Sequence, residues 1–118
     1  MSARFPHQRL RVYRLAVELA VLAKGLSDRV PRGYRGLADQ LIRSGPAVAL
    51  LIAEGANRES LAQKRQRFAE ARGECGEAAA TVEVLVQMRL LLGEDPSRFE
   101  RTADEVAAML TGLIRRHS

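Results

Sequence analysis

Residues 60–92 read SLAQKRQRFAEARGECGEAAATVEVLVQMRLLL, an uninterrupted run of 33 residues without proline. As a single helix this run would be about 50 Å long, which is long for a chain of 118 residues. Ser60 followed by Gln63 fits a capping box, in which both side chains satisfy backbone N–H groups at a helix start. We therefore predict a long helix that begins at Ser60 and ends at Leu92, just before Gly93.

One face of this predicted helix carries only small residues. Ala69, Gly73, Gly76 and Ala80 follow each other at helical spacing. Because glycine costs about 1 kcal/mol relative to alanine inside a helix, two glycines on one stripe indicate that another backbone passes close by. The alternative is a solvated face that tolerates them.

The composition is typical of an all-α protein, since Ala, Leu, Arg and Glu dominate and there is no Trp. Residues 1–118 are expected to form a single domain. The only cysteine, Cys75, is interpreted as a small buried residue and not as a nucleophile. With no signal peptide and no apolar run long enough for a membrane span, a soluble, cytoplasmic protein without cofactors is expected.

Three further helices are predicted around the long one. The first covers Leu10 to Leu26 and is followed by a polar loop over residues 28–33. The second covers Tyr34 to Ala56, where Gly45-Pro46 predicts a kink or a break. The fourth begins with Asp95 as N-cap and Pro96 as first helical residue. Short connections between the four helices predict an antiparallel, up-down-up-down four-helix bundle with a kinked second helix and a long third helix.

The first helix has two apolar stripes where a bundle helix normally has one. The stripes are Leu10, Tyr13, Val17, Val21 and Leu15, Leu19, Leu22, Leu26. One stripe is expected to face the core and the other a neighbouring subunit. On this hypothesis, glutamate at Leu19 or Val21 would reduce the assembly size without loss of helicity. The alternative is that this helix is the most central one.

The net charge of +5 is carried by residues 1–59, which hold ten Arg and Lys against five Asp and Glu. Residues 60–118 hold nine of each, and seventeen of the nineteen cations are arginine. Arginine binds phosphate through its planar fork, so this balance indicates an anionic partner such as RNA or DNA. An arginine excess also fits a GC-rich genome, and a charged run also fits a solvated face.

The sequence gives little support for an enzymatic activity or for a metal site. A di-iron bundle needs Glu-x-x-His pairs, but the histidines are His7 and His117, near the ends of the chain. Glu70, Glu74 and Glu77 lie at helical spacing and are expected to pair with arginines more readily than with a metal ion. Glu54, which follows a buried apolar run, is expected to be a paired structural charge; the alternative is a contact with Arg58 or Arg43.

The sequence resembles the family of small four-helix-bundle proteins first met as open reading frames inside intervening sequences of bacterial 23S rRNA. The resemblance covers nearly the whole chain, and its most specific part is the Ile-Ala-Glu-Gly tetrapeptide. The matching positions are Val12 to Ala16, Pro31, Tyr34, Gly36, Leu37, Gln40, Leu41, Arg43, Ile52, Ala53, Glu54, Gly55, Arg58, Ser60, Ala71, Gly73 and Glu77.

This resemblance implies a homopentamer without enzymatic activity. It also implies a relation to accessory proteins of diversity-generating retroelements, which bind a reverse transcriptase and structured RNA. The chain departs from the family pattern at Ile42-Arg43, at Pro46, in residues 47–51, and at Lys64 and Arg67, where the family has aromatic residues. These departures leave the fold expectation intact and put partner-specific contacts in question.

The sequence is therefore consistent with two functions. In the first, a homo-oligomer binds structured nucleic acid through phosphate contacts from cationic side chains. The residues are Arg9, Arg11, Arg14, Arg43, Lys64, Arg65 and Arg67. In the second, the basic face docks an acidic protein such as a reverse transcriptase, without binding nucleic acid.

Overall fold

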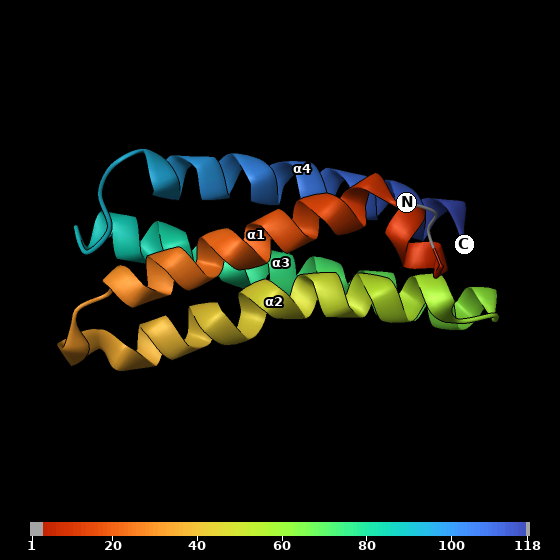
Figure 1. Ribbon diagram of the computed structural model, residues 1–118, viewed down its shortest axis with the longest axis horizontal. Helices are drawn as coiled ribbons and strands as arrows, with labels where there is room; N and C mark the ends of the chain where they lie inside the picture. The colour runs from red at the N-terminus through yellow and green to blue at the C-terminus, as the bar shows by residue number, and fades with distance from the viewer. Residues whose placement is uncertain (1–3, 118) are drawn as a thin grey trace.

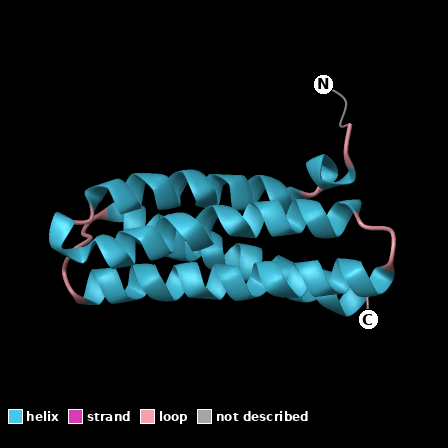
Figure 2. Cartoon of the chain, turned by 90° about the horizontal axis from the view of Figure 1, so that it is seen from below, coloured by secondary structure: helices cyan, strands magenta, loops and turns pink. Residues whose placement is uncertain are grey.

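Helices make up most of the chain in the computed structural model, which describes residues 4–117. A short 3₁₀ helix, η1 (Pro6–Arg9), precedes α1 (Arg11–Arg29), and a second, η2 (Arg32–Tyr34), leads into α2 (Arg35–Asn57). The helices α3 (Leu61–Gln87) and α4 (Glu94–Arg116) complete the chain. Consecutive helices are neighbours and α4 closes back on α1, which confirms the antiparallel four-helix bundle (Figures 1 and 2).

The core is built from one face of each helix. From α1 it takes Val12, Ala16, Leu19, Ala23 and Leu26, all essentially inaccessible to solvent. The largest buried side chains are Phe68 of α3 and Phe99 of α4. None of the helices within residues 4–117 combines the length and apolar character needed to span a bilayer.

Of the α1 stripe formed by Leu10, Tyr13, Val17 and Val21, the two valines face outward, whereas Leu10 and Tyr13 pack against the core. Val21 is 68% exposed and Val17 39% exposed, whereas Leu19 is 0% exposed. Since α1 lies at a corner of the bundle and contacts only α2 and α4 among the long helices, it is not the most central helix. The expectation for Leu19 was wrong, because a glutamate there would enter the core of this chain and unfold it.

The helix α2 continues through Gly45-Pro46 without a break (Figure 1). Gly45 is fully enclosed, and a Cβ built on it would lie 2.5 Å from the Cβ of Ala23 in α1. Ser44, also buried, donates a hydrogen bond from Oγ to the carbonyl oxygen of Gln40 at 2.9 Å. Tertiary packing of α2 on α1 therefore keeps the helix continuous where the dipeptide alone predicts a kink or a break.

The helix α3 begins as predicted, with Ser60 Oγ accepting a hydrogen bond from the N–H of Gln63 at 3.3 Å. It ends earlier than predicted, at Gln87, because Arg89 takes a left-handed φ of 62°. The N–H groups of Leu90 and Arg89 then bond to the carbonyls of Leu85 and Val86, both at 2.9 Å. This pattern is a Schellman motif, which normally has glycine at the left-handed position.

Two other helix limits also differ from the predictions. The helix α1 runs on to Arg29, three residues beyond Leu26, through Ser27 and Asp28. The helix α4 begins at Glu94, so Pro96 occupies the third position of its first turn, where a missing N–H breaks no helical hydrogen bond. Gly93, with φ of 97°, provides the N-cap position that was assigned to Asp95.

The small-residue face of α3 points to solvent. Ala69, Gly73, Gly76 and Ala80 are all exposed, and no atom lies within 4 Å of a Cβ built on either glycine. No backbone of the described chain passes close by, so the expected close approach does not occur within this chain.

Candidate nucleic-acid interface

One end of the bundle collects many of the cationic side chains. It is formed by η1, the start of α1, the end of α2, the start of α3 and the end of α4, and we call it the terminal end (Figure 1). Its cations are Arg4, Arg9, Arg11, Arg14, Arg58, Lys64, Arg65, Arg67, Arg115 and Arg116. Its carboxylates are fewer: Glu54, Glu59, Glu70 and Glu105.

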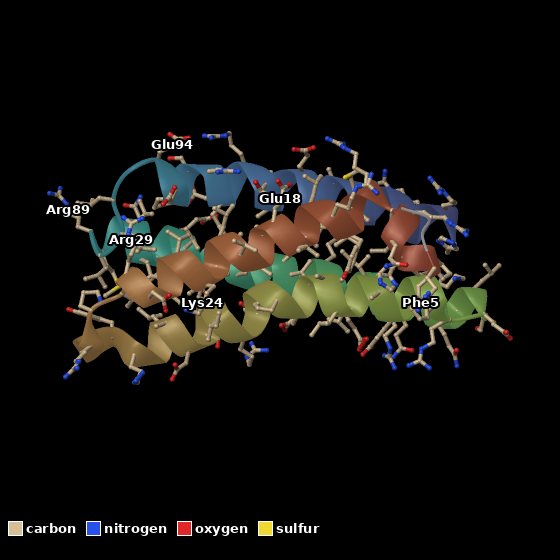
Figure 3. All side chains as sticks on the ribbon, in the orientation of Figure 1. Phe5, Glu18, Lys24, Arg29, Arg89 and Glu94 are labelled. Atoms are coloured by element: carbon tan, nitrogen blue, oxygen red, sulfur yellow. The ribbon has the colours of Figure 1, made fainter. Side chains whose placement is uncertain are left out.

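The opposite end of the bundle is more balanced in charge. Arg29, Arg89 and Glu94 lie there, far from Phe5 at the terminal end (Figure 3). Arg29 donates a hydrogen bond to the carbonyl oxygen of Leu92 at 2.6 Å and lies 3.5 Å from the carboxylate of Asp95. The surplus of positive charge therefore belongs to the terminal end.

Six of the seven cations proposed from the sequence lie at the terminal end, but several are already engaged. Lys64 donates from Nζ to the carbonyl oxygens of Ala56 at 2.9 Å and Gly55 at 3.4 Å, which neutralises the C-terminus of α2. Arg14 donates to the carbonyl oxygen of Gln8 at 3.3 Å. Arg11 pairs with Glu105 of α4 at 2.8 Å.

Arg67 is held between two carboxylates. Its Nη1 is 2.7 Å from Glu70, and this hydrogen bond is the main cause that raises the pKa of Arg67. Its Nε lies 3.2 Å from Glu54, an ion-pair distance at which the N–H does not point at the oxygen. Glu54 is therefore a paired structural charge as expected, and its partner is Arg67, whereas the alternative partners Arg58 and Arg43 make no ion pair with it.

Arg43 is the one proposed cation that lies away from the terminal end. It sits in the middle of α2 and bridges to α3, with Nη1 3.1 Å from Glu74 and Nη2 hydrogen-bonded to Glu77. The hydrogen bond to Glu77 is the largest of the causes that raise the pKa of Arg43. These two carboxylates would compete with any phosphate for its guanidinium.

The remaining cations of the terminal end are free to bind an external anion. The side chains of Arg9 and Arg65 make no ion pair or hydrogen bond with any residue of the described range 4–117. The same holds, within that range, for Arg58, Arg115 and Arg116, which sequence reasoning did not include. A signal existed for Arg115 and Arg116, because an even number of antiparallel helices brings the start and the end of the chain together.

The family tetrapeptide is part of the packing that builds this end. Ile52 is fully buried in the core, and a Cβ on Gly55 would lie 2.8 Å from the ring of Phe68. Tyr13 packs edge-on against His7 with ring centroids 4.6 Å apart. Of the other motif positions, Ala53 is partly buried, Glu77 bonds to Arg43, and Gly73 is exposed.

The glutamates of α3 act as partners for arginine. Glu70 binds Arg67, and Glu74 and Glu77 bind Arg43. Within residues 4–117, no three His, Cys, Asp or Glu side chains come together in a way that would hold a metal ion. Cys75 is buried, its Sγ lies 3.3 Å from the carbonyl oxygen of Ala103, and burial raises the pKa of its thiol to about 11.

Comparison with known proteins identifies the family. A model of the 23S rRNA-intervening sequence protein family matches residues 8–112. The chain belongs to this family. The match includes α1, α2 and α3 completely and most of α4, whereas Arg115 and Arg116 at the end of α4 lie outside it.

A solved structure has the same fold. It is the crystal structure of a protein of unknown function, of the S23 ribosomal protein family, from Bacteroides thetaiotaomicron. The two structures align with a TM-score of 0.82 and 21% sequence identity, over 87% of this chain and 97% of the other. Comparison with curated proteins gives no match.

Proposed function

We propose that this member of the 23S rRNA-intervening sequence protein family is a non-enzymatic protein that binds structured nucleic acid, RNA above all. The observation that carries this proposal is the set of arginines at the terminal end without an internal partner, of which Arg58, Arg65, Arg115 and Arg116 come from three different helix ends. Guanidinium groups in such an arrangement match phosphates spaced along a backbone and read no bases. The family's association with rRNA intervening sequences supports RNA as the polymer.

Not every cation that the sequence suggested contributes equally to this function. We assign the phosphate contacts to Arg9 and Arg65, which are among the seven cations proposed from the sequence, and to Arg58, Arg115 and Arg116. Arg11, Arg43, Arg67 and Lys64 hold the helices together, since each is bonded to a carboxylate or a carbonyl oxygen of a different helix. Arg14 belongs to neither group, because its partner is a carbonyl oxygen of the adjacent η1 segment and not of another long helix.

The test is fluorescence anisotropy with a labelled, structured RNA at about 50 mM and about 200 mM salt. The variant Arg65→Gln/Arg115→Gln/Arg116→Gln removes three cations from the terminal end. Its matched control, Arg32→Gln/Arg35→Gln/Arg98→Gln, removes three unpaired cations from the opposite end. We expect the first variant to bind at least about tenfold more weakly and to show a shallower salt dependence, by about 0.7 to 0.9 per lost contact.

The proposal is wrong if the wild-type protein binds no structured RNA at the lower salt concentration. It is also wrong if the two triple variants lose affinity equally, because the binding would then reflect net charge and not the terminal end.

We also propose that the protein forms a homo-oligomer, for which the family resemblance gives five subunits. The exposed stripe of α1 with Val17 and Val21 supports this proposal, together with Leu50 of α2, which is 65% exposed. Native mass spectrometry should show a mass near five times 13.0 kDa for the wild-type protein and a smaller species for Val21→Glu. Leu92→Glu, an equally exposed position in the α3–α4 loop, is the control and should keep the wild-type mass.

The second candidate is docking of an acidic protein, such as a reverse transcriptase, at the same end. It is favoured by the same free guanidinium groups, since arginine forks bind carboxylates as well as phosphates. A pull-down in the presence of nuclease distinguishes the two: a partner that stays bound and is lost in the terminal-end triple variant supports docking, and RNA binding would then be absent in the anisotropy experiment.

A further inference from the structure

A recess opens between the start of α1 and the end of α4, within the terminal end. It has a volume of about 300 Å³ and is lined by Leu10, Arg11, Val12, Met109, Gly112, Leu113 and Arg116. A second recess of about 200 Å³ lies beside it and shares Leu10, Leu113 and Arg116 with the first. We call the larger one the α1/α4 recess.

The sequence of α4 leaves this space open. Met109, Gly112, Leu113 and Arg116 follow each other at helical spacing and line one face of the last turns. A Cβ built on Gly112 meets nothing within 4 Å beyond its own helix backbone and chain neighbours, so this exposed glycine leaves open space between larger neighbours. A larger residue at this position can therefore enter the recess without displacing the chain.

The walls are apolar and the charges at the rim are positive. No carboxylate lines either recess. Arg11 is balanced by its ion pair with Glu105, whereas Arg116 makes no ion pair with any residue of the range 4–117. An occupant is therefore expected to place an apolar body against Leu10, Met109 and Leu113 and a negative group beside Arg116.

A nucleotide meets both requirements. A nucleobase has two flat apolar faces, and its phosphate follows within a few bonds. A volume near 300 Å³ is at the lower end of small-molecule sites, which suits one ring system and not a larger ligand. Unpaired bases of RNA commonly leave the helical stack and pack against side chains, including arginine guanidinium planes.

We propose that the α1/α4 recess binds one unpaired nucleobase of an RNA held at the terminal end, with Arg116 on the neighbouring phosphate. The proposal rests on the proposed nucleic-acid function and adds a preference to it. In a continuous duplex the bases stay stacked inside, so only the phosphates reach the protein. An RNA with an unpaired nucleotide should bind more tightly than a duplex with the same number of phosphates.

The test uses two RNAs of equal length, a fully paired duplex and a duplex with a single bulged 2-aminopurine. The variant Gly112→Leu fills the recess. Its control, Gly36→Leu, adds the same side chain where a Cβ also meets no atom, at the opposite end of the bundle. Circular dichroism checks that both variants keep the wild-type helix content.

We expect the wild-type protein to bind the bulged RNA about tenfold more tightly than the duplex, because one base removes part of its apolar face from water against the recess. The 2-aminopurine fluorescence should change on binding. Gly112→Leu should lower the affinity for the bulged RNA to that for the duplex and abolish the fluorescence change, while Gly36→Leu behaves as wild type. Arg116→Gln should weaken the binding of both RNAs.

Each other outcome has a defined meaning. If the wild-type protein binds both RNAs equally, or if Gly112→Leu keeps the preference, the base-binding recess is wrong while the proposed function stands. If neither RNA binds, both are wrong. If Gly112→Leu leaves RNA binding unchanged but alters the mass in native mass spectrometry, the recess is occupied by a second copy of the chain, and the base-binding proposal is also overturned.

Discussion

The contact between Gly45 of α2 and Ala23 of α1 gives the sharpest test of how the bundle is packed. A Cβ added to Gly45 would lie 2.5 Å from the Cβ of Ala23. Carbon atoms in contact normally stay about 3.5 to 4.0 Å apart. Both Cβ atoms are fixed directly to helix backbones, so no rotamer change relieves the overlap. We predict that Gly45→Ala forces α1 and α2 apart and destabilises the protein.

The magnitude follows from two opposing contributions. Overpacking of a closely packed core costs about 1 to 3 kcal/mol. Replacing glycine by alanine inside a helix returns about 1 kcal/mol. We therefore expect Gly45→Ala to lower the free energy of unfolding by up to about 2 kcal/mol. Gly25→Ala is the control, because a Cβ there meets no atom, and it should raise that free energy by up to about 1 kcal/mol.

Urea unfolding followed by circular dichroism measures these differences, and a second substitution makes the test specific. Ala23→Gly removes the methyl group that the new side chain meets. The double variant Gly45→Ala/Ala23→Gly should be more stable than the sum of the single changes by about 1 to 3 kcal/mol. The reasoning is refuted if Gly45→Ala stabilises the protein as Gly25→Ala does, or if the double-mutant cycle shows no coupling.

Three further predictions concern single positions. Burial raises the pKa of the Cys75 thiol from 9.0 to about 11, so the thiol ionises at lower pH in the unfolded chain than in the folded one. The free energy of unfolding is therefore retained below pH 9 and falls by about 1 to 2 kcal/mol as the pH rises towards 11. Chemical unfolding over this pH range should show this loss in the wild-type protein and not in Cys75→Ala. Arg89→Gly should raise the free energy of unfolding by about 0.5 to 1 kcal/mol, since φ is 62° there, and Arg89→Ala, which keeps a Cβ, should give no such gain. Ser60→Ala should cost about 1 kcal/mol in urea unfolding through loss of the α3 cap, and Ser60→Asp should restore most of it.

The sequence was sufficient to predict the helices and the bundle, because apolar periodicity and the Ser60 cap are local signals. Of the two outcomes that Gly45-Pro46 predicts, a kink or a break, the break does not occur, since α2 is continuous and this glycine serves the contact with α1. The sequence placed the end of α3 too late, because the left-handed residue is Arg89 where the usual signal is glycine. The contact of Gly45 with α1 is a tertiary interaction, and the left-handed backbone of Arg89 is a conformational one. The residue type alone predicts neither of them.

The candidate site was predictable only in part. Net charge and arginine content indicated an anionic partner, and the topology alone places the ends of the chain together. Which arginines stay free depends on how the helices are rotated about their axes. Arg43 of α2 meets Glu74 and Glu77 only because α2 and α3 turn these side chains towards each other. The α1/α4 recess likewise depends on the relative position of Gly112 and Leu10, which no local pattern specifies.

The positions of the family motif explain how the packing and the site are connected. Gly55 lets the ring of Phe68 approach α2, and its carbonyl oxygen, with that of Ala56, accepts from Lys64. Glu54 holds Arg67 from the same segment. These contacts fix the start of α3 against the end of α2. The motif therefore acts on the proposed site indirectly, because it places the end of α2 that carries Arg58 beside the start of α3 that carries Arg65.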